Sequence, residues 1–178
     1  DALGLGAATI DVAYTATNSA IDMAKEIKNK LVAARQPGVD RTKIQAEVTE
    51  LQNQLKSIGD SAVFSGENWL STDSSAANYN ASKTIVASFT RSGSSISIGT
   101  ISVNTANVKL YDAGAGATEV GIVDGLRDIA TGLISATGTF SVATLSISAL
   151  TDSATDLTTL ENYIKGTDKA ISEMTTSA

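Results

Sequence analysis

Apolar residues recur at intervals of three and four positions in three separate stretches of the chain, a spacing that predicts helices. The stretches cover residues 3–34, 40–62 and 157–174. Their apolar positions form three seams: Ile10, Tyr14, Ile21 and Leu31; then Ile44, Val48, Leu51, Leu55 and Ile58; then Leu157, Leu160, Ile164, Ile171 and Met174. Because the second seam repeats about every 3.5 residues, we expect left-handed supercoiling, with Leu51 in the core and Gln52 facing solvent.

Breaking and capping residues separate these helices. Pro37 and Gly38 end the first, and Asp40 is a suitable N-cap for the second. Since the connection is short, the two helices should lie antiparallel. Asp152 and Ser153 precede the third helix as candidate caps, so both ends of the chain are expected to share one helical domain, residues 1–72 and 151–178.

The intervening residues 73–150 are rich in Ser and Thr and poor in charge. Apolar and polar residues alternate over 84–90, 95–103, 107–111 and 139–147, which predicts strands, with a turn at 91–94. Residues 119–134 show helical spacing instead and are predicted to form a helix. The predicted fold is therefore α+β: an elongated, coiled-coil-like bundle of long antiparallel helices with an inserted β-rich lobe at 73–150.

Composition removes most functional classes. The chain has no His and no Cys among its 178 residues, so the usual nucleophile–base pairs and nitrogen or sulfur metal sites are absent. A net charge of −6 argues against nucleic acid, and the uncharged stretch 129–151 contains too many hydroxyl residues for a membrane helix. We therefore expect no catalytic, cofactor-binding or metal-binding residues.

Two local patterns are typical of binding or catalytic sites. Gly114, Ala115 and Gly116 lie where a dinucleotide-binding turn could form, but Glu119 replaces the third glycine and would repel a pyrophosphate. Asp124 and Asp128, with Arg127 between them, could form an acid–base or cation site. These aspartates lack the oxygen-ligand spacing of a calcium loop. The favoured interpretations are therefore a flexible turn for the glycine pattern and a solvated helix face for the aspartates.

Two segments resemble bacterial flagellin. The helix beginning Ile44-Gln-Ala-Glu leads into Phe64-Ser-Gly-Glu-Asn-Trp-Leu, which is similar to the Phe-Asn-Gly-x-x-Leu-Leu hairpin of that family in its alphaproteobacterial form. The tail from Asp168 to Thr176 is similar to the family's descending helix. The resemblance covers about residues 1–72 and 145–178, and assigns the hairpin motif to Phe64, Gly66, Trp69 and Leu70 within residues 63–71.

This resemblance implies a structural subunit of the bacterial flagellar filament, self-assembling for motility, with residues 73–150 as a variable outer domain. It also implies an extracellular protein exported by the flagellar type III route, with other flagellin subunits, an export chaperone and cap proteins as partners, and no membrane or nucleic acid. The terminal segments that form the innermost tube of such filaments are not found in this sequence, so we expect the chain to be a fragment that is mainly monomeric.

Two other functional classes fit the sequence. A hook–filament junction protein has the same helical ends and would form a short ring rather than a long polymer. A surface adhesin or glycan-binding module could use the Ser- and Thr-rich lobe.

Overall fold

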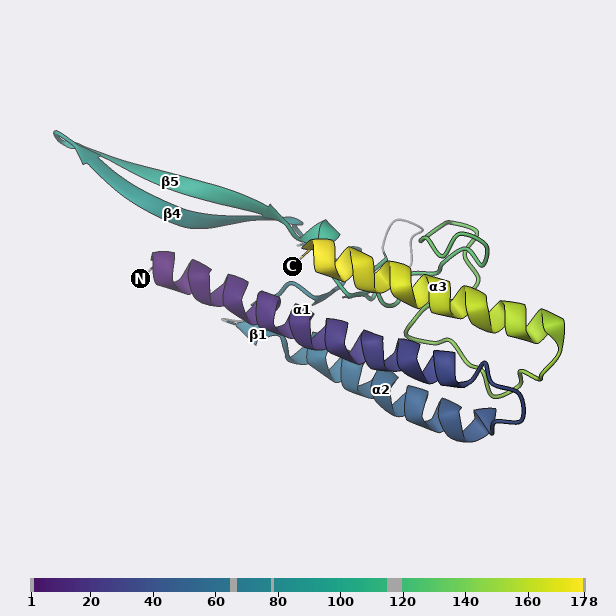
Figure 1. The fold of residues 1–178 in the computed structure, drawn as a ribbon. Coiled ribbons are helices and arrows are strands. Elements are labelled where there is room, and N and C mark those ends of the chain that lie inside the picture. Colours follow the sequence, from purple (N-terminus) through teal and green to yellow (C-terminus); the bar gives the residue numbers. More distant parts are fainter. Residues whose placement is uncertain (1, 65–66, 78, 115–119, 178) are drawn as a thin grey trace.

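The described residues form three long helices and several small sheets, which is an α+β fold (Figure 1). The computed structural model describes residues 2–64, 67–77, 79–114 and 120–177. Helix α1 (Ala2–Ala33) lies between α2 (Arg41–Ser61) and α3 (Ala154–Ser177), and both neighbours run antiparallel to it. The α1–α2 turn contains Gly38 at a φ of 78°, a left-handed conformation that glycine adopts without strain.

The predicted helix starts agree with the structure. The Asp40 side chain accepts hydrogen bonds from the backbone N–H groups of Thr42 and Lys43 and so caps α2. Before α3, the Ser153 hydroxyl accepts a 3.2 Å bond from the backbone N–H of Asp156. Both caps satisfy donors that have no partner inside the first turn of a helix.

Where the structure describes the chain, the strands form three separate two-stranded sheets. Strand β1 (Val63–Phe64) pairs antiparallel with β2 (Glu67–Asn68), and β3 (Ser71–Thr72) pairs parallel with β6 (Tyr111–Asp112). The long hairpin joins β4 (Ser82–Ser92) to β5 (Ser95–Asn104) through a turn at Gly93, as the alternation predicted. A short 3-10 helix, η1 (Thr105–Asn107), leads back to the body.

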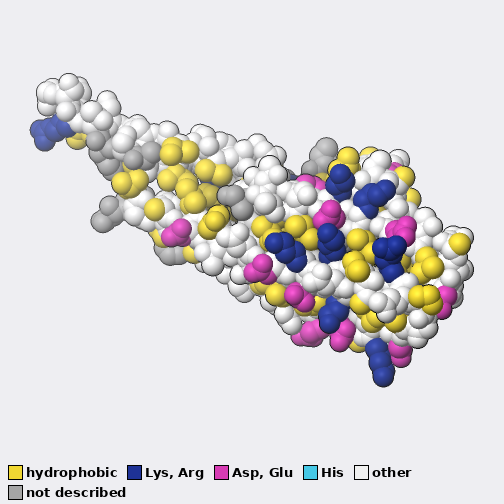
Figure 2. Space-filling view, in the orientation of Figure 1, with side chains coloured by type: hydrophobic (Ala, Val, Ile, Leu, Met, Phe, Trp, Pro, Cys, Tyr) yellow, Lys and Arg dark blue, Asp and Glu magenta, His cyan; other side chains and the backbone are white. Residues whose placement is uncertain are grey.

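The hairpin extends away from the helices, while residues 105–114 and 120–150 lie against them (Figure 1). On the face seen in Figure 2, basic and acidic side chains are interspersed over the helical body, and apolar side chains gather towards the hairpin. The chain is therefore an elongated body with one projecting arm.

Three predicted elements of the middle region are wrong. Residues 120–134 form successive turns rather than a helix, residues 139–147 form no strand, and the strand predicted at 107–111 shortens to β6. Helical hydrogen bonds occur singly, from Gly125 N to Gly121 O and from Gly132 N to Asp128 O. Gly132 adopts a φ of 74°, which ends the second of these turns.

Candidate functional site

The packing surface of α1 is buried from the middle of the helix to its end. Ile21 and Leu31 of the predicted seam are buried, together with Ala24 and Ile27, whereas Ile10 and Tyr14 are 40% and 50% exposed. These two residues border a small hollow lined also by Trp69, Val103 and Val108.

The α2 seam is buried to different depths along its length. Val48 and Leu55 are fully buried, and Ile44, Leu51 and Ile58 are partly buried against the same cluster. The fully buried pair is separated by seven residues, which is two helical turns, so these two residues form the centre line of the α2 contact.

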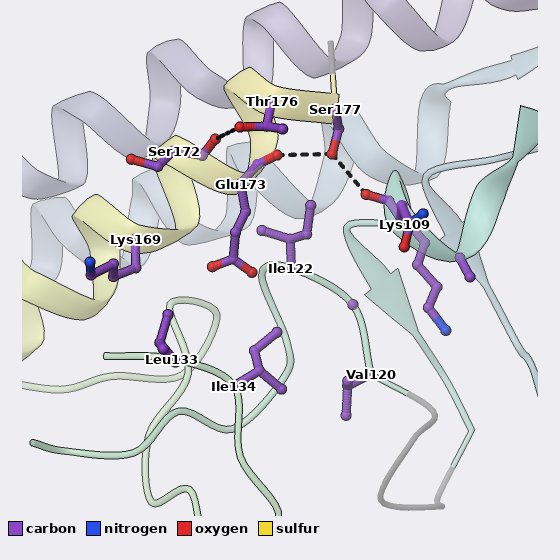
Figure 3. A pocket seen from close by; sticks show the side chains of 13 residues that line it. Lys109, Val120, Ile122, Leu133, Ile134, Lys169, Ser172, Glu173, Thr176 and Ser177 are labelled. Carbon is purple, nitrogen blue, oxygen red and sulfur yellow. Dashed lines mark hydrogen bonds between the residues drawn. The ribbon is translucent and has the colours of Figure 1, made fainter. Parts of the chain in front are cut away.

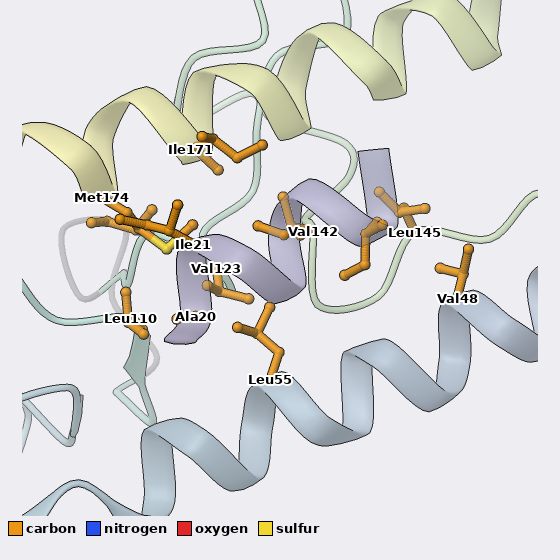
Figure 4. Close-up of a cluster of buried hydrophobic side chains, with 14 of the residues drawn as sticks. Ala20, Ile21, Val48, Leu55, Leu110, Val123, Val142, Leu145, Ile171 and Met174 are labelled. Atoms are coloured by element: carbon orange, nitrogen blue, oxygen red, sulfur yellow. The ribbon is translucent and has the colours of Figure 1, made fainter. Parts of the chain in front are cut away.

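The α3 seam completes the core. Leu160, Ile171 and Met174 are buried, Ile164 is partly buried against them, and Leu157 is half-buried. Figure 4 shows side chains from all three helices meeting Leu110, Val123, Val142 and Leu145 of the intervening region. The core therefore joins the helices to residues 105–114 and 120–150. The sequence pattern had assigned the apolar residues of this region to separate strands and a helix.

Glutamines of α2 hold part of this intervening region. Gln52 Nε2 donates to the carbonyls of Val142 and Leu145 at 3.0 and 3.1 Å, and the backbone N–H of Ile147 donates to Gln45 Oε1 at 2.9 Å. The prediction that Gln52 faces solvent is therefore wrong. Its amide donates to backbone carbonyls that would otherwise need a partner on a neighbouring strand. Residues 142–147 can therefore pack in the core without forming a strand.

Arg127 is a charged residue with a fully buried side chain. Its guanidinium donates to Glu173 Oε2 of α3 at 2.7 Å and to the carbonyls of Gly132 and Ile122 at 3.0 and 2.8 Å. One cation thus fixes the loop 120–134 to α3. A solvated face was the wrong interpretation for this position.

The two aspartates beside Arg127 are also engaged by the backbone. Asp124 accepts from the N–H groups of Asp112 and Gly121, and its burial raises the pKa of its carboxyl. Asp128 accepts from the N–H groups of Thr131 and Ala130, which lower the pKa of its carboxyl. Both carboxylates therefore order turns and are not arranged as an acid–base pair.

The arginine that opens α2 is a second buried cation. Arg41 donates from Nε to the carbonyl of Ala34 and forms a 2.8 Å ion pair with Asp152, ahead of α3. The hydrogen bond from Arg41 lowers the pKa of the Asp152 carboxyl. This contact links the α1–α2 turn to the start of α3.

The hairpin motif closes the end of α2. Trp69 and Leu70 are buried, while Gly66 and the side chain of Phe64 lie outside the described residues. Asn68 organises this turn: its Nδ2 donates to the carbonyl of Gly59 at 2.7 Å, and its Oδ1 accepts from the N–H groups of Leu70 and Ser71. The role of Asn68 was missed because its partners are backbone atoms.

A hollow of about 610 Å³ separates the end of α3 from the loop 120–134. Its lining includes Ile122, Leu133 and Ile134, with Lys169 and Glu173 on α3 (Figure 3). Oε2 of Glu173 is paired with the Arg127 guanidinium, so this carboxylate joins α3 to the loop 120–134.

Within the part of the chain that the structure describes, no group of acidic residues is arranged to hold a metal ion. Nor is any helix there long and apolar enough to cross a membrane. Of the glycine turn considered above, Ala115, Gly116 and Glu119 lie outside the described residues.

Comparison with known proteins identifies relatives over the whole chain. Residues 1–75 match the family described as bacterial flagellin N-terminal helical region. The chain is 43% identical to flagellin C of Rhizobium meliloti (strain 1021), with 100% of this chain and 57% of that protein aligned. It is 41% identical to flagellin A of Rhizobium meliloti over 88% of this chain and 40% of that protein.

A more distant match is the flagellin of Brucella melitensis biotype 1, at 35% identity over 58% of this chain and 35% of that protein. The chain thus spans about half the length, or less, of the curated relatives that it matches.

Proposed function

Because this chain belongs to the bacterial flagellin family, we propose that it is part of a structural, non-catalytic subunit of the extracellular flagellar filament, which assembles with copies of itself for motility. The observation that carries this proposal is the alignment of the entire chain, hairpin and intervening region included, with flagellin C at 43% identity. The helical body supports it, since two ends of one chain meet in a single bundle.

We propose that the three seams act as a coiled-coil-like packing surface that keeps the subunit straight and stiff. Fully buried residues recur on each helix, for example Leu31, Leu55 and Leu160. Ion pairs lie beside them on the outside, between Lys28 and Asp168 and between Arg35 and Glu161. Such exposed pairs add little stability but favour one register of the helices.

The same proposal divides the subunit into a helical domain, residues 1–72 and 151–178, and an outer domain, residues 73–150. The motif at 63–71 marks their junction, because Asn68 binds the last turn of α2 while Trp69 and Leu70 enter the core. The projecting β4–β5 hairpin is then the part of the outer domain that reaches farthest from the helices.

Export by the flagellar type III route, with a chaperone before export and cap proteins at the growing tip, belongs to the same proposal. The partners in the filament are further copies of the full-length subunit. By itself the present chain is proposed to be mainly monomeric, which analytical ultracentrifugation at micromolar concentration would test.

Electron microscopy of the full-length gene product tests the central claim. A strain lacking the gene should regain long filaments and swimming when the gene is restored. Short rings at the tip of the hook, without long filaments, would assign the protein to the hook–filament junction instead. Normal filaments and swimming in the deletion strain would exclude a role as a required filament subunit.

A further inference from the structure

The β4–β5 hairpin carries apolar residues that nothing in its own chain covers among the described residues. Ile96 is 66% exposed and Ile98 is 54% exposed. Being two residues apart on β5, they lie on the same face of the hairpin. Strands β4 and β5 pair only with each other in the described sheets, so the arm is a single thin ribbon.

The charge on this arm has one sign. Between Ser82 and Asn104 the only charged residues are Lys83 and Arg91, whereas the whole chain has a net charge of −6. Lys83 lies at the base of the hairpin and is paired with Glu67. Arg91 lies opposite Ile96 near the tip, is exposed, and forms no ion pair with an acid of the described residues. The far end of the arm is therefore apolar and basic.

A groove of matching character runs between α1 and α2. It has a volume of about 420 Å³, and its apolar lining includes Val12, Ala16 and Ile58. Asp11 stands at its edge, exposed and without an ion pair among the described residues. Asp22 is also exposed and follows eleven residues later, about three helical turns, so it continues the acidic edge on the same face of α1.

The arm cannot fill the groove of its own chain. Its base is fixed on α1 by Ile85, which is buried against Gly6, and from there the hairpin extends beyond the helical body (Figures 1 and 2). The groove lies farther along α1, beside the last turns of α2. A second molecule is needed to bring the two surfaces together.

Resting on the filament function above, we propose that the hairpin of one copy docks in the α1–α2 groove of a second copy. Ile96 and Ile98 enter the apolar groove, and Arg91 faces Asp11. Because the arm and the groove are different surfaces of the same chain, the contact is heterologous and leaves a free arm and a free groove at either end. It therefore propagates as an open series of subunits rather than closing as a dimer.

The size of the arm sets the strength of this contact. Ten residues of β5 span roughly 34 Å, and one face of a two-stranded ribbon buries only a few hundred Å². This is below the about 800 Å² per partner of a stable interface. The contact is accordingly weak between free chains and becomes effective where many subunits are held side by side.

Disulfide cross-linking tests the contact, since the chain contains no cysteine of its own. This chain carrying Ile96→Cys is mixed at high concentration with the same chain carrying Ala16→Cys and oxidised. Cross-linked heterodimers are expected, and a chain with both substitutions should give a ladder of oligomers. Lys43→Cys, which is exposed at the opposite end of α2, replaces Ala16→Cys as the control and should give background yield.

A charge exchange tests the register. Arg91→Glu should lower the cross-linking yield about two- to fivefold, the range expected of one exposed ion pair. Asp11→Lys in the groove partner should restore the yield. Failure to restore it, with both chains folded by circular dichroism, overturns the placement of Arg91 against Asp11.

The outcomes separate the two proposals. Equal yields with the Lys43 control, or efficient dimers of Ile96→Cys with itself, overturn docking in the groove even if the full-length protein forms filaments. Absence of filaments under the electron microscope rejects the proposed function, whatever the cross-linking yield.

Discussion

At the scale of single residues, Leu55 is the clearest test of the α2 seam. Its side chain is fully buried at the centre of the core, so Leu55→Ala should leave a cavity and lower the free energy of unfolding by about 2 to 5 kcal/mol. Its neighbour Gln54 is exposed, and Gln54→Ala should change stability by no more than about 0.5 kcal/mol. Urea denaturation of both variants measures the difference; equal midpoints would show that the wrong face of α2 was assigned to the core.

Two glutamates of α3 allow a matched comparison of buried and exposed pairs. Glu173→Gln leaves the buried Arg127 guanidinium without an anion and should cost about 1 to 3 kcal/mol. Glu161→Gln disrupts the pair with Arg35, in which both side chains are about half exposed, and should cost at most about 0.5 kcal/mol. Chemical denaturation of the two proteins distinguishes these effects, and a larger loss for Glu161→Gln would contradict the role given to Arg127.

The sequence predicts the burial of some residues but not the contacts of others, and the difference has a physical reason. Val48 and Leu55 are recognisable because burial repeats with the helical period within one short segment. The ion pair of Arg127 with Glu173 and the hydrogen bonds of Gln52 join residues that lie 46 to 93 positions apart in the chain. Nothing in the local pattern indicates which partner a lone Arg or Gln will meet after folding.

At the scale of elements, Gly166 of α3 is needed for packing, although glycine usually destabilises a helix. A Cβ added at Gly166 would lie 2.6 Å from Cε2 of Phe140, whose ring centroid lies 4.9 Å from that of Tyr163. Although Gly to Ala normally favours a helix by up to about 1 kcal/mol, Gly166→Ala should destabilise the protein by about 1 to 3 kcal/mol.

Gly4 of α1 is the control for this substitution, because no atom lies within 4 Å of a Cβ placed there. Gly4→Ala should therefore be neutral or stabilising. In thermal melts, Gly166→Ala should lower the melting temperature and Gly4→Ala should leave it unchanged or raise it. A stabilising Gly166→Ala would mean that Phe140 is free to move away from α3.

The three helices were predictable because each combines a long periodic pattern with a capping residue such as Asp40. The segment 119–134 also has apolar residues at helical spacing, yet it forms turns over its described part. Gly121, Gly125 and Gly132 weaken a helix there, and the Asp128 carboxylate binds the N–H groups of Ala130 and Thr131 and starts a separate turn. Apolar spacing alone cannot separate a helix from turns that are buried to the same degree.

At the scale of the whole molecule, the hairpin should be separable from the body. Lys83 and Val103 are paired across the base of the hairpin, so an Asn-Gly turn placed between them can replace residues 84–102. The loss of Ile85 from its site against α1 should cost about 1 to 2 kcal/mol. Circular dichroism should show unchanged helicity and a cooperative melt at a slightly lower temperature.

Replacing all of residues 73–150 by a flexible linker tests the proposed domain division. The helices would retain contacts among residues such as Ile27, Leu31 and Leu160 but would lose Val123 and Val142 from the shared core. We expect a helical protein that melts well below the hairpin deletion. Complete loss of a transition would mean that helices and intervening region are one folding unit.

Trp69, the only tryptophan of the chain, is 5% exposed at the junction of the hairpin motif, the start of α1 and the β4–β5 arm. Its fluorescence is therefore a native optical reporter of that junction, while circular dichroism at 222 nm reports mainly on the three helices. If the two signals change together during unfolding, the junction and the helices unfold as one cooperative unit. If the emission shifts to the red first, the arm detaches before the bundle melts, and the order of events in disassembly can be followed without attaching a dye.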